Sequence, residues 1–117
     1  MIGDREETVV SETTPDGMTV IRVRGDLDEE TSPALARTLL AAADSSCSRT
    51  LVDLSEVEFA DSTALHTLLT AQRAHTAAGT VLVLAGPVQV AVRRLFEVTN
   101  AGVAFRWAEN IQQGLTC

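Results

Sequence analysis

The segment that could carry chemistry is Glu58-Phe59-Ala60-Asp61-Ser62-Thr63-Ala64-Leu65, where a carboxylate and two hydroxyls follow one another before a stretch with helical periodicity. Asp, Ser and Thr are favoured at helix N-termini because their side-chain oxygens accept hydrogen bonds from unpaired N–H groups of the first turn. One interpretation is that Asp61 or Ser62 simply caps a helix. The other is that Ser62 is presented for phosphorylation, because the start of a helix tolerates an added phosphate.

Other combinations of reactive residue types are weaker. No G-x-S-x-G nucleophile elbow surrounds Ser62, which argues against a small serine hydrolase. His66 and His75 are nine residues apart, without the i, i+4 spacing of a metal-binding pair, and we interpret both as polar surface residues. Cys47 and Cys117 are isolated thiols. The sequence therefore predicts neither a catalytic residue nor a metal site.

Length, charge and hydropathy narrow the class of protein. The 117 residues fit one domain, and the apolar fraction of 45% with a mean hydropathy of +0.13 is sufficient for a buried core. A formal net charge of −7 without a basic cluster argues against binding of nucleic acid or of an anionic membrane surface. The sequence shows neither an apolar stretch of the roughly 20 residues that span a membrane nor a signal peptide. We therefore expect a cytoplasmic protein.

Hydrophobic patterning predicts five strands. Thr8–Thr13 and Met18–Arg24 are expected to form a hairpin around the Asp16-Gly17 turn. Leu51–Leu54 and Val81–Ala85 are short apolar runs without alternation, which is typical of buried parallel strands. A last strand is expected over Val103–Arg106.

Four stretches have the periodicity of helices. They are Ser32 to about Ser46, Ser62 to about Ala78, a stretch opened by Gly86-Pro87, and one from about Ala108. Ser32 is expected to be an N-cap with Pro33 as the first helical residue, and Gly79 to end the second helix. The order β-β-α-β-α-β-α-β-α predicts a single α/β domain over residues 8–117 after a flexible segment 1–7, with a mixed sheet of about five strands and about four helices.

The order of several short motifs resembles that of the STAS-domain anti-sigma-factor antagonists of bacterial partner-switching systems, over Met18 to Leu115. The motifs are Gly25-Asp26-Leu27-Asp28 (the family's G-x-L-D loop), Leu51–Leu54, Phe59–Leu65 (hydrophobic-x-D-S-[ST]-G-L), Ala77-Ala78-Gly79 before Val81–Leu84, and Val92–Phe96 (V-x-[KR]-[KRL]-[LF]-F). Each motif alone is weak, but their order and spacing together are specific. The resemblance therefore favours modification of Ser62 over capping alone.

The resemblance implies that Ser62 is the phosphorylated residue, with Thr63 as the alternative acceptor. The unphosphorylated form would bind an anti-sigma factor, a serine kinase of the GHKL type, and so free a sigma factor. Phosphorylation would abolish this binding, and a serine phosphatase would restore it. No cofactor is expected on this chain, since ATP and magnesium belong to the kinase. The alternative is a non-phosphorylated regulatory STAS subunit of a transport or lipid-trafficking complex.

Five residues of the motifs are expected to contact the partner: Asp28, Asp61, Thr63, Ala64 and His66. The family usually has glycine at the position of Ala64 and often at that of His66. Glycine lets another backbone approach closely, so we expect these two side chains to alter the docking surface. A phosphate beside Asp61 on an acidic chain would have to be desolvated or repelled, which weakens binding.

Overall fold

The computed structural model describes residues 9–45 and 49–116, and its elements follow the predicted order. The strands are β1 (Val9–Thr13), β2 (Thr19–Leu27), β3 (Arg49–Ala60), β4 (Val81–Ala85) and β5 (Arg106–Ala108); the helices are α1 (Ser32–Asp44), α2 (Ser62–Ala78), α3 (Val90–Thr99) and α4 (Ile111–Thr116), with a 3₁₀ turn η1 (Ala101–Ala104). The predicted α/β fold with a mixed five-stranded sheet is confirmed. The expectations for residues 1–7, Cys47 and Cys117 lie outside the described residues.

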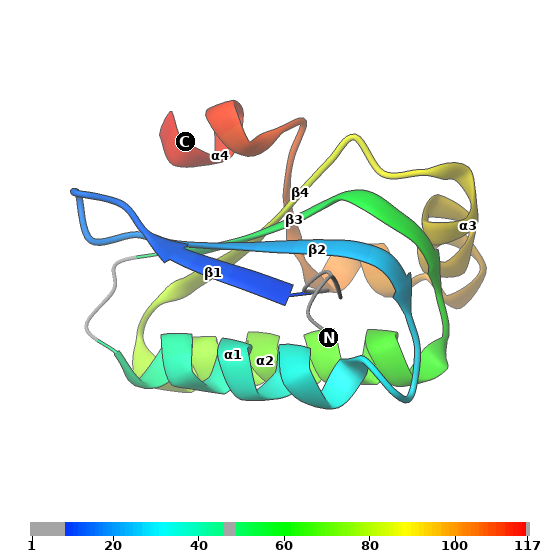
Figure 1. Cartoon of the computed structure of the whole chain (residues 1–117), viewed down its shortest axis with the longest axis horizontal. Coiled ribbons are helices and arrows are strands. Elements are labelled where there is room, and N and C mark those ends of the chain that lie inside the picture. Colours follow the sequence, from blue (N-terminus) through cyan, green and yellow to red (C-terminus); the bar gives the residue numbers. More distant parts are fainter. Residues whose placement is uncertain (1–8, 46–48, 117) are drawn as a thin grey trace, which may run out of the picture.

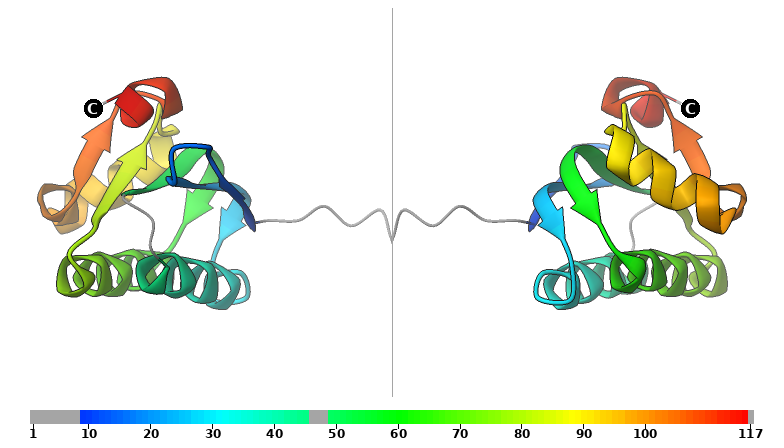
Figure 2. Two further views of the ribbon diagram at one scale, coloured as in Figure 1. Left: turned by 90° about the vertical axis from the view of Figure 1, so that its left-hand side faces the viewer. Right: turned by 90° about the vertical axis from the view of Figure 1, so that its right-hand side faces the viewer.

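The five strands form one sheet in sequence order. β1 pairs antiparallel with β2, and the other three pairings are parallel. Parallel neighbours need crossover connections, and α1, α2 and α3 supply them. The first two of these helices lie side by side against one face of the sheet, while α4 lies over the other face (Figures 1 and 2).

Each face of the sheet carries an apolar cluster. The larger cluster lies between the sheet and α1, α2 and α3, and its fully buried side chains include Ile21, Leu35 and Leu84. The smaller cluster contains Leu51 and other strand residues, against which α4 packs. The central strands have uninterrupted apolar runs, so both of their faces must be covered. This explains why helices lie on both sides of the sheet.

The strands β2 and β3 are longer than the sequence predicts. β3 continues past the expected end at Leu54 as far as Ala60, because β2 also continues and pairs with it up to Leu27. Register shifts between Arg22 and Arg24 and between Gly25 and Asp26 interrupt the ladder. Such bulges disturb the two-residue alternation that identifies a strand in the sequence.

Four other boundaries are corrected by the structure. The N-cap of α1 is Thr31 rather than Ser32, because the Asp28 carbonyl accepts the Ser32 N–H at 2.8 Å and the chain turns into the helix one residue early. α3 begins at Val90, after an extended connection that follows Gly86-Pro87. The last strand lies at Arg106–Ala108 rather than at Val103–Arg106, since Asn100 in the left-handed region (φ 57°) leads from α3 directly into η1. The closing helix begins at Ile111 rather than near Ala108, which lies in β5.

His75 is fully buried, so its interpretation as a surface residue is wrong. Its Nδ1 lies 2.8 Å from the carbonyl oxygen of Ala71, and its Nε2 lies 2.9 Å from Oγ1 of the buried Thr50. A carbonyl can only accept, so Nδ1 carries the hydrogen and Nε2 accepts from the Thr50 hydroxyl. The ring therefore joins α2 to β3 through two buried hydrogen bonds.

The two histidines of α2 make a matched pair for a stability measurement. His75→Ala is expected to lower the free energy of unfolding by about 2–4 kcal/mol, because it leaves a cavity and removes two buried hydrogen bonds. His66→Ala, at an exposed position, is expected to change it by no more than about 0.5 kcal/mol. Urea unfolding followed by circular dichroism measures both; equal losses in the two variants would contradict the buried role of His75.

Candidate functional site

The candidate site lies where β2 and β3 end together. Leu27 and Ala60 are register partners in the parallel pair, so the residues after them leave the sheet at the same edge. The N–H of Asp61 donates to the Leu27 carbonyl at 3.2 Å and ties the two exits to each other. This pairing places the loop that begins at Asp28 beside the first turn of α2, which begins at Ser62.

Asp61 is the N-cap of α2. Its backbone is extended (φ −112°, ψ −173°), and its Oδ1 accepts from the N–H of Ala64 at 3.1 Å. Ser62 is the first residue of the helix, and its side chain is exposed. The sequence allows either Asp61 or Ser62 as the cap. The structure assigns the cap to Asp61, so the Ser62 hydroxyl does not take part in capping the helix.

The loop after β2 is held by its own side chains. Oδ1 of Asp28 accepts from the N–H groups of Glu30 (3.0 Å) and Thr31 (3.2 Å). The hydroxyl of Thr31 donates to the carbonyl of Asp26 at 3.0 Å and accepts from the N–H of Asp28 at 2.9 Å. Asp28 is half-buried, and its carboxylate fixes the loop that lies beside Ser62.

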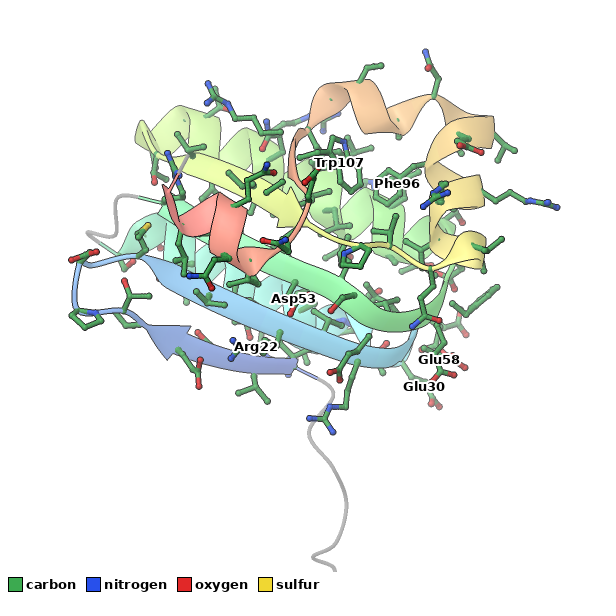
Figure 3. All side chains as sticks on the ribbon, turned by 90° about the horizontal axis from the view of Figure 1, so that it is seen from above. Arg22, Glu30, Asp53, Glu58, Phe96 and Trp107 are labelled. Carbon is green, nitrogen blue, oxygen red and sulfur yellow. The ribbon has the colours of Figure 1, made fainter. Side chains whose placement is uncertain are left out.

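Carboxylates gather at this edge of the sheet and form what we call the acidic surface. It consists of Asp26, Asp28, Glu29, Glu30, Glu58 and Asp61, all exposed or half-buried. Figure 3 shows Glu58, near the end of β3, and Glu30, in the loop after β2, at the same edge of the molecule. The nearest basic side chain on β2, that of Arg24, already lies 3.7 Å from the carboxylate of Glu56. The surface around Ser62 is therefore strongly negative.

Phe59 is an apolar residue within this acidic surface, and it has no assigned role in the sequence prediction. Its side chain is 49% exposed, although it is one of only four aromatic residues. The ladder pairs Val57 with Gly25 and Phe59 with Asp26, so Glu58 is an extra residue on β3. The bulge turns Phe59 outward where simple alternation from the buried Val57 would turn it inward. The sequence alone carries no signal for this exposure.

The structure separates the predicted site residues into an outer and an inner group. Ser62, Thr63 and His66 are exposed, and His66 lies one turn after Ser62 at the hollow between α1 and α2. Ala64 has 0% exposure and belongs to the larger apolar cluster. The expectation that its methyl group contacts a partner is wrong, because position 64 lies on the face of α2 that packs against the sheet.

The described part of the chain contains neither a metal-binding group of side chains nor a membrane-spanning helix. Residues 9–45 and 49–116 contain no group of three or more His, Cys, Asp or Glu side chains placed to hold a metal ion. Across the same residues, every helix is too short or too polar to cross a membrane.

Comparison with known proteins relates this geometry to a family. A family model described as "Mlab, STAS domain" matches residues 10–105. The fold is similar to that of an anti-sigma factor antagonist from Mycobacterium paratuberculosis, with 28% identity, a TM-score of 0.81 and coverage of 93% of this chain and 91% of that one. No curated protein is a significant match in sequence.

Two solved structures of SpoIIAA are similar in fold. The anti-sigma factor antagonist SpoIIAA in its unphosphorylated form shares 16% identity, with a TM-score of 0.72 over 92% of this chain and 94% of that one. The Bacillus cell fate determinant SpoIIAA in the phosphorylated form shares 18%, with a TM-score of 0.68 over 89% and 94%. At these identities the likeness concerns the fold alone.

The cap at Asp61 can be tested by two substitutions at one position. Asp61→Ala is expected to lower the free energy of unfolding by about 1 kcal/mol, because the N–H of Ala64 loses its acceptor. Asp61→Asn keeps an oxygen in the same place and is expected to retain most of that stability. Urea unfolding measures the stability of both variants. If Asp61→Asn loses as much stability as Asp61→Ala, the hydrogen bond from the Ala64 N–H is not what stabilises the helix.

Proposed function

Since the chain belongs to the STAS domain family, we propose that it is an anti-sigma-factor antagonist switched by phosphorylation of Ser62. The unphosphorylated form binds an anti-sigma factor that is also a serine kinase, and so frees a sigma factor. Phosphorylation by that kinase ends the binding, and a serine phosphatase restores it. In this proposal the chain is a cytoplasmic bacterial regulator rather than an enzyme, needs no cofactor of its own and does not bind nucleic acid or a membrane.

The observation that carries the proposal is the exposed hydroxyl of Ser62 at the first position of α2, beside a cap that is already complete. A kinase can reach this hydroxyl without opening the fold. The unpaired N–H groups and the partial positive charge of the first turn favour an anion there. The similarity to an anti-sigma factor antagonist from Mycobacterium paratuberculosis supports the same role.

The acidic surface favours a partner with a basic docking surface. Opposite charges on the two proteins would raise the rate of association more than the affinity. Phe59, exposed and surrounded by carboxylates, has the character of an apolar anchor within a polar rim. Thr63 and His66 extend this surface along α2, beyond the half-buried Asp28 and Asp61 that belong to it.

Charge explains why phosphorylation would end the binding. A phosphoserine adds about −1.5 to −2 charges at neutral pH, next to Asp61. If the basic groups of the partner pair with the carboxylates already present, none is left to face Ser62. In an interface that fits a hydroxyl, the phosphate is then desolvated without a cation of its own. A cost of about 4 kcal/mol lowers the affinity about a thousandfold, and no change of fold is needed.

The site of modification can be tested by intact mass. The purified chain, incubated with ATP, magnesium and the serine kinase encoded by a neighbouring gene, is expected to gain the mass of one phosphoryl group. Thr63→Val should gain it as well, whereas Ser62→Ala should not, because Ser62 is the acceptor. Modification that persists in Ser62→Ala would assign it to Thr63. An unmodified wild-type chain would favour the alternative, a STAS subunit of a transport or lipid-trafficking complex.

The role of charge can be tested by two substitutions of nearly equal shape. Ser62→Asp is expected to weaken binding to the anti-sigma factor at least tenfold in calorimetry, because it adds a charge to the interface. Ser62→Asn adds a similar volume without charge and should retain more of the affinity. The circular dichroism spectrum of both should be unchanged, since an acidic residue in the first turn favours the helix. Equal affinities of the two variants would show that volume, and not charge, controls docking.

A further inference from the structure

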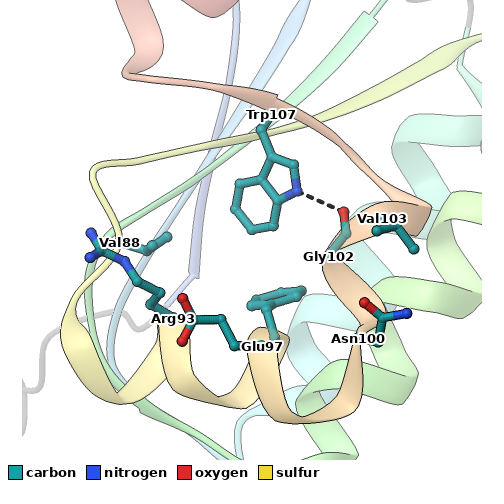
Figure 4. A pocket seen from close by; sticks show the side chains of 8 residues that line it. Val88, Arg93, Glu97, Asn100, Gly102, Val103 and Trp107 are labelled. Carbon is teal, nitrogen blue, oxygen red and sulfur yellow. Dashed lines mark hydrogen bonds between the residues drawn. The ribbon is translucent and has the colours of Figure 1, made fainter.

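An apolar pocket opens between α3, η1 and β5, and none of the residues of the proposed switch lines it. Its volume is about 350 Å³, within the range of about 300–1,000 Å³ that small-molecule sites occupy. Val88, Phe96, Val103 and Trp107 provide its apolar walls (Figure 4). The proposed function leaves this pocket without a role.

The aromatic rings of the pocket are held in place. The ring centroids of Phe96 and Trp107 lie 5.0 Å apart at 85°, and those of Phe96 and Phe105 lie 5.9 Å apart at 87°. The indole Nε1–H of Trp107 donates to the Gly102 carbonyl at 2.8 Å. The polar atom of the indole is thus paired, while 40% of the Trp107 surface remains exposed. The pocket is thus open before any ligand binds.

The walls of the pocket are also tied to the rest of the domain. The side-chain amide of Gln72 on α2 donates to the carbonyl of Ala104 at 3.2 Å, which holds η1. The amide of Gln89, at the start of α3, donates to the carbonyl of Ser55 on β3 at 3.1 Å. Such preformed walls need little ordering when a ligand binds.

Two opposite charges border the pocket. Arg93 and Glu97 are exposed, lie one turn apart on α3 and both line the cavity (Figure 4). Within the described residues neither forms an ion pair, and the order Arg before Glu is the less favourable one for a mutual pair in a helix. A cation and an anion beside an apolar cavity complement a small zwitterion with an apolar body.

We propose that this pocket binds a free apolar amino acid. The side chain of the ligand lies against Trp107 and Phe96, its carboxylate is bound by Arg93, and its ammonium group by Glu97. Arg suits the first role because its planar guanidinium matches a carboxylate. The inference goes beyond the proposed switch and does not depend on it.

The indole N–H resonance of Trp107 tests the proposal directly, because the chain has only one tryptophan. In nitrogen–proton correlation spectra, L-phenylalanine is expected to shift this resonance in a saturable way. Phenylacetate and 2-phenylethylammonium each lack one charge and should bind about fivefold more weakly. Glycine, which lacks the apolar body, should cause no shift. No saturable shift with L-phenylalanine at millimolar concentration, or binding of either singly charged analogue as tightly as L-phenylalanine, would overturn the proposal.

Three variants locate the ligand. Arg93→Gln is expected to weaken binding of L-phenylalanine about fivefold. Arg94→Gln, its exposed neighbour that does not line the pocket, is expected to leave binding within about twofold. A Cβ at Gly102 would lie 3.8 Å from Phe96 Cβ and from Trp107 Nε1, which is ordinary contact, so Gly102→Leu should fold and fill the cavity.

Gly102→Leu is therefore expected to abolish the binding while the circular dichroism spectrum stays unchanged. Equal losses in Arg93→Gln and Arg94→Gln would overturn the role of Arg93. Normal binding to folded Gly102→Leu would show that the ligand lies elsewhere and would overturn the site itself.

Discussion

The parallel pairing of β2 and β3 up to their last residues is the constraint on which the candidate site depends. If the ladder ended at Leu54, as the apolar run in the sequence suggests, the Asp28 loop and the start of α2 would not be fixed to each other. The pairing of Leu27 with Ala60 and the hydrogen bond from Asp61 to the Leu27 carbonyl join the two segments through backbone groups. The functional side chains therefore do not have to hold the site together.

This arrangement divides the polar residues of the site between structure and binding. Asp61 completes the cap of α2, and Asp28 with Thr31 closes the loop beside it. Ser62 is exposed at the same place and is not needed for the cap. A residue that is exposed but rigidly placed is a suitable substrate for modification, because a phosphate attached to it breaks no bond of the cap or of the loop.

The sequence predicts the parts of this structure that depend on local patterns. The order of the elements, the limits of α2 and the bounds of β4 follow from apolar runs, capping residues and Gly79. The bulge that lengthens β3 and exposes Phe59 depends on pairing between distant segments, which a local pattern does not contain. Ala64 and His75 were misplaced for a different reason. The buried positions Ala64, Leu68, Ala71 and His75 repeat at helical spacing, so the sequence does indicate which face of α2 is buried. His75 is nevertheless predicted to be exposed because it is polar, and Ala64 because it lies in the motif of the candidate site.

The proposed switch and the proposed ligand pocket are two ways in which a small acidic domain could respond to a signal without changing its fold. At Ser62, the bonds that define the local structure are complete without a phosphate, so in the proposed switch an added charge would act on the docking partner rather than on the helix. At Trp107, the bond to the Gly102 carbonyl keeps the indole in place with or without a ligand. At Ser62 the rigid part is made of hydrogen bonds between the Asp28, Thr31 and Asp61 side chains and the backbone, and at the pocket it is made of packed aromatic rings. In both places the responsive part is a side chain at the surface. In both proposals, regulation would therefore reside in what the surface can bind.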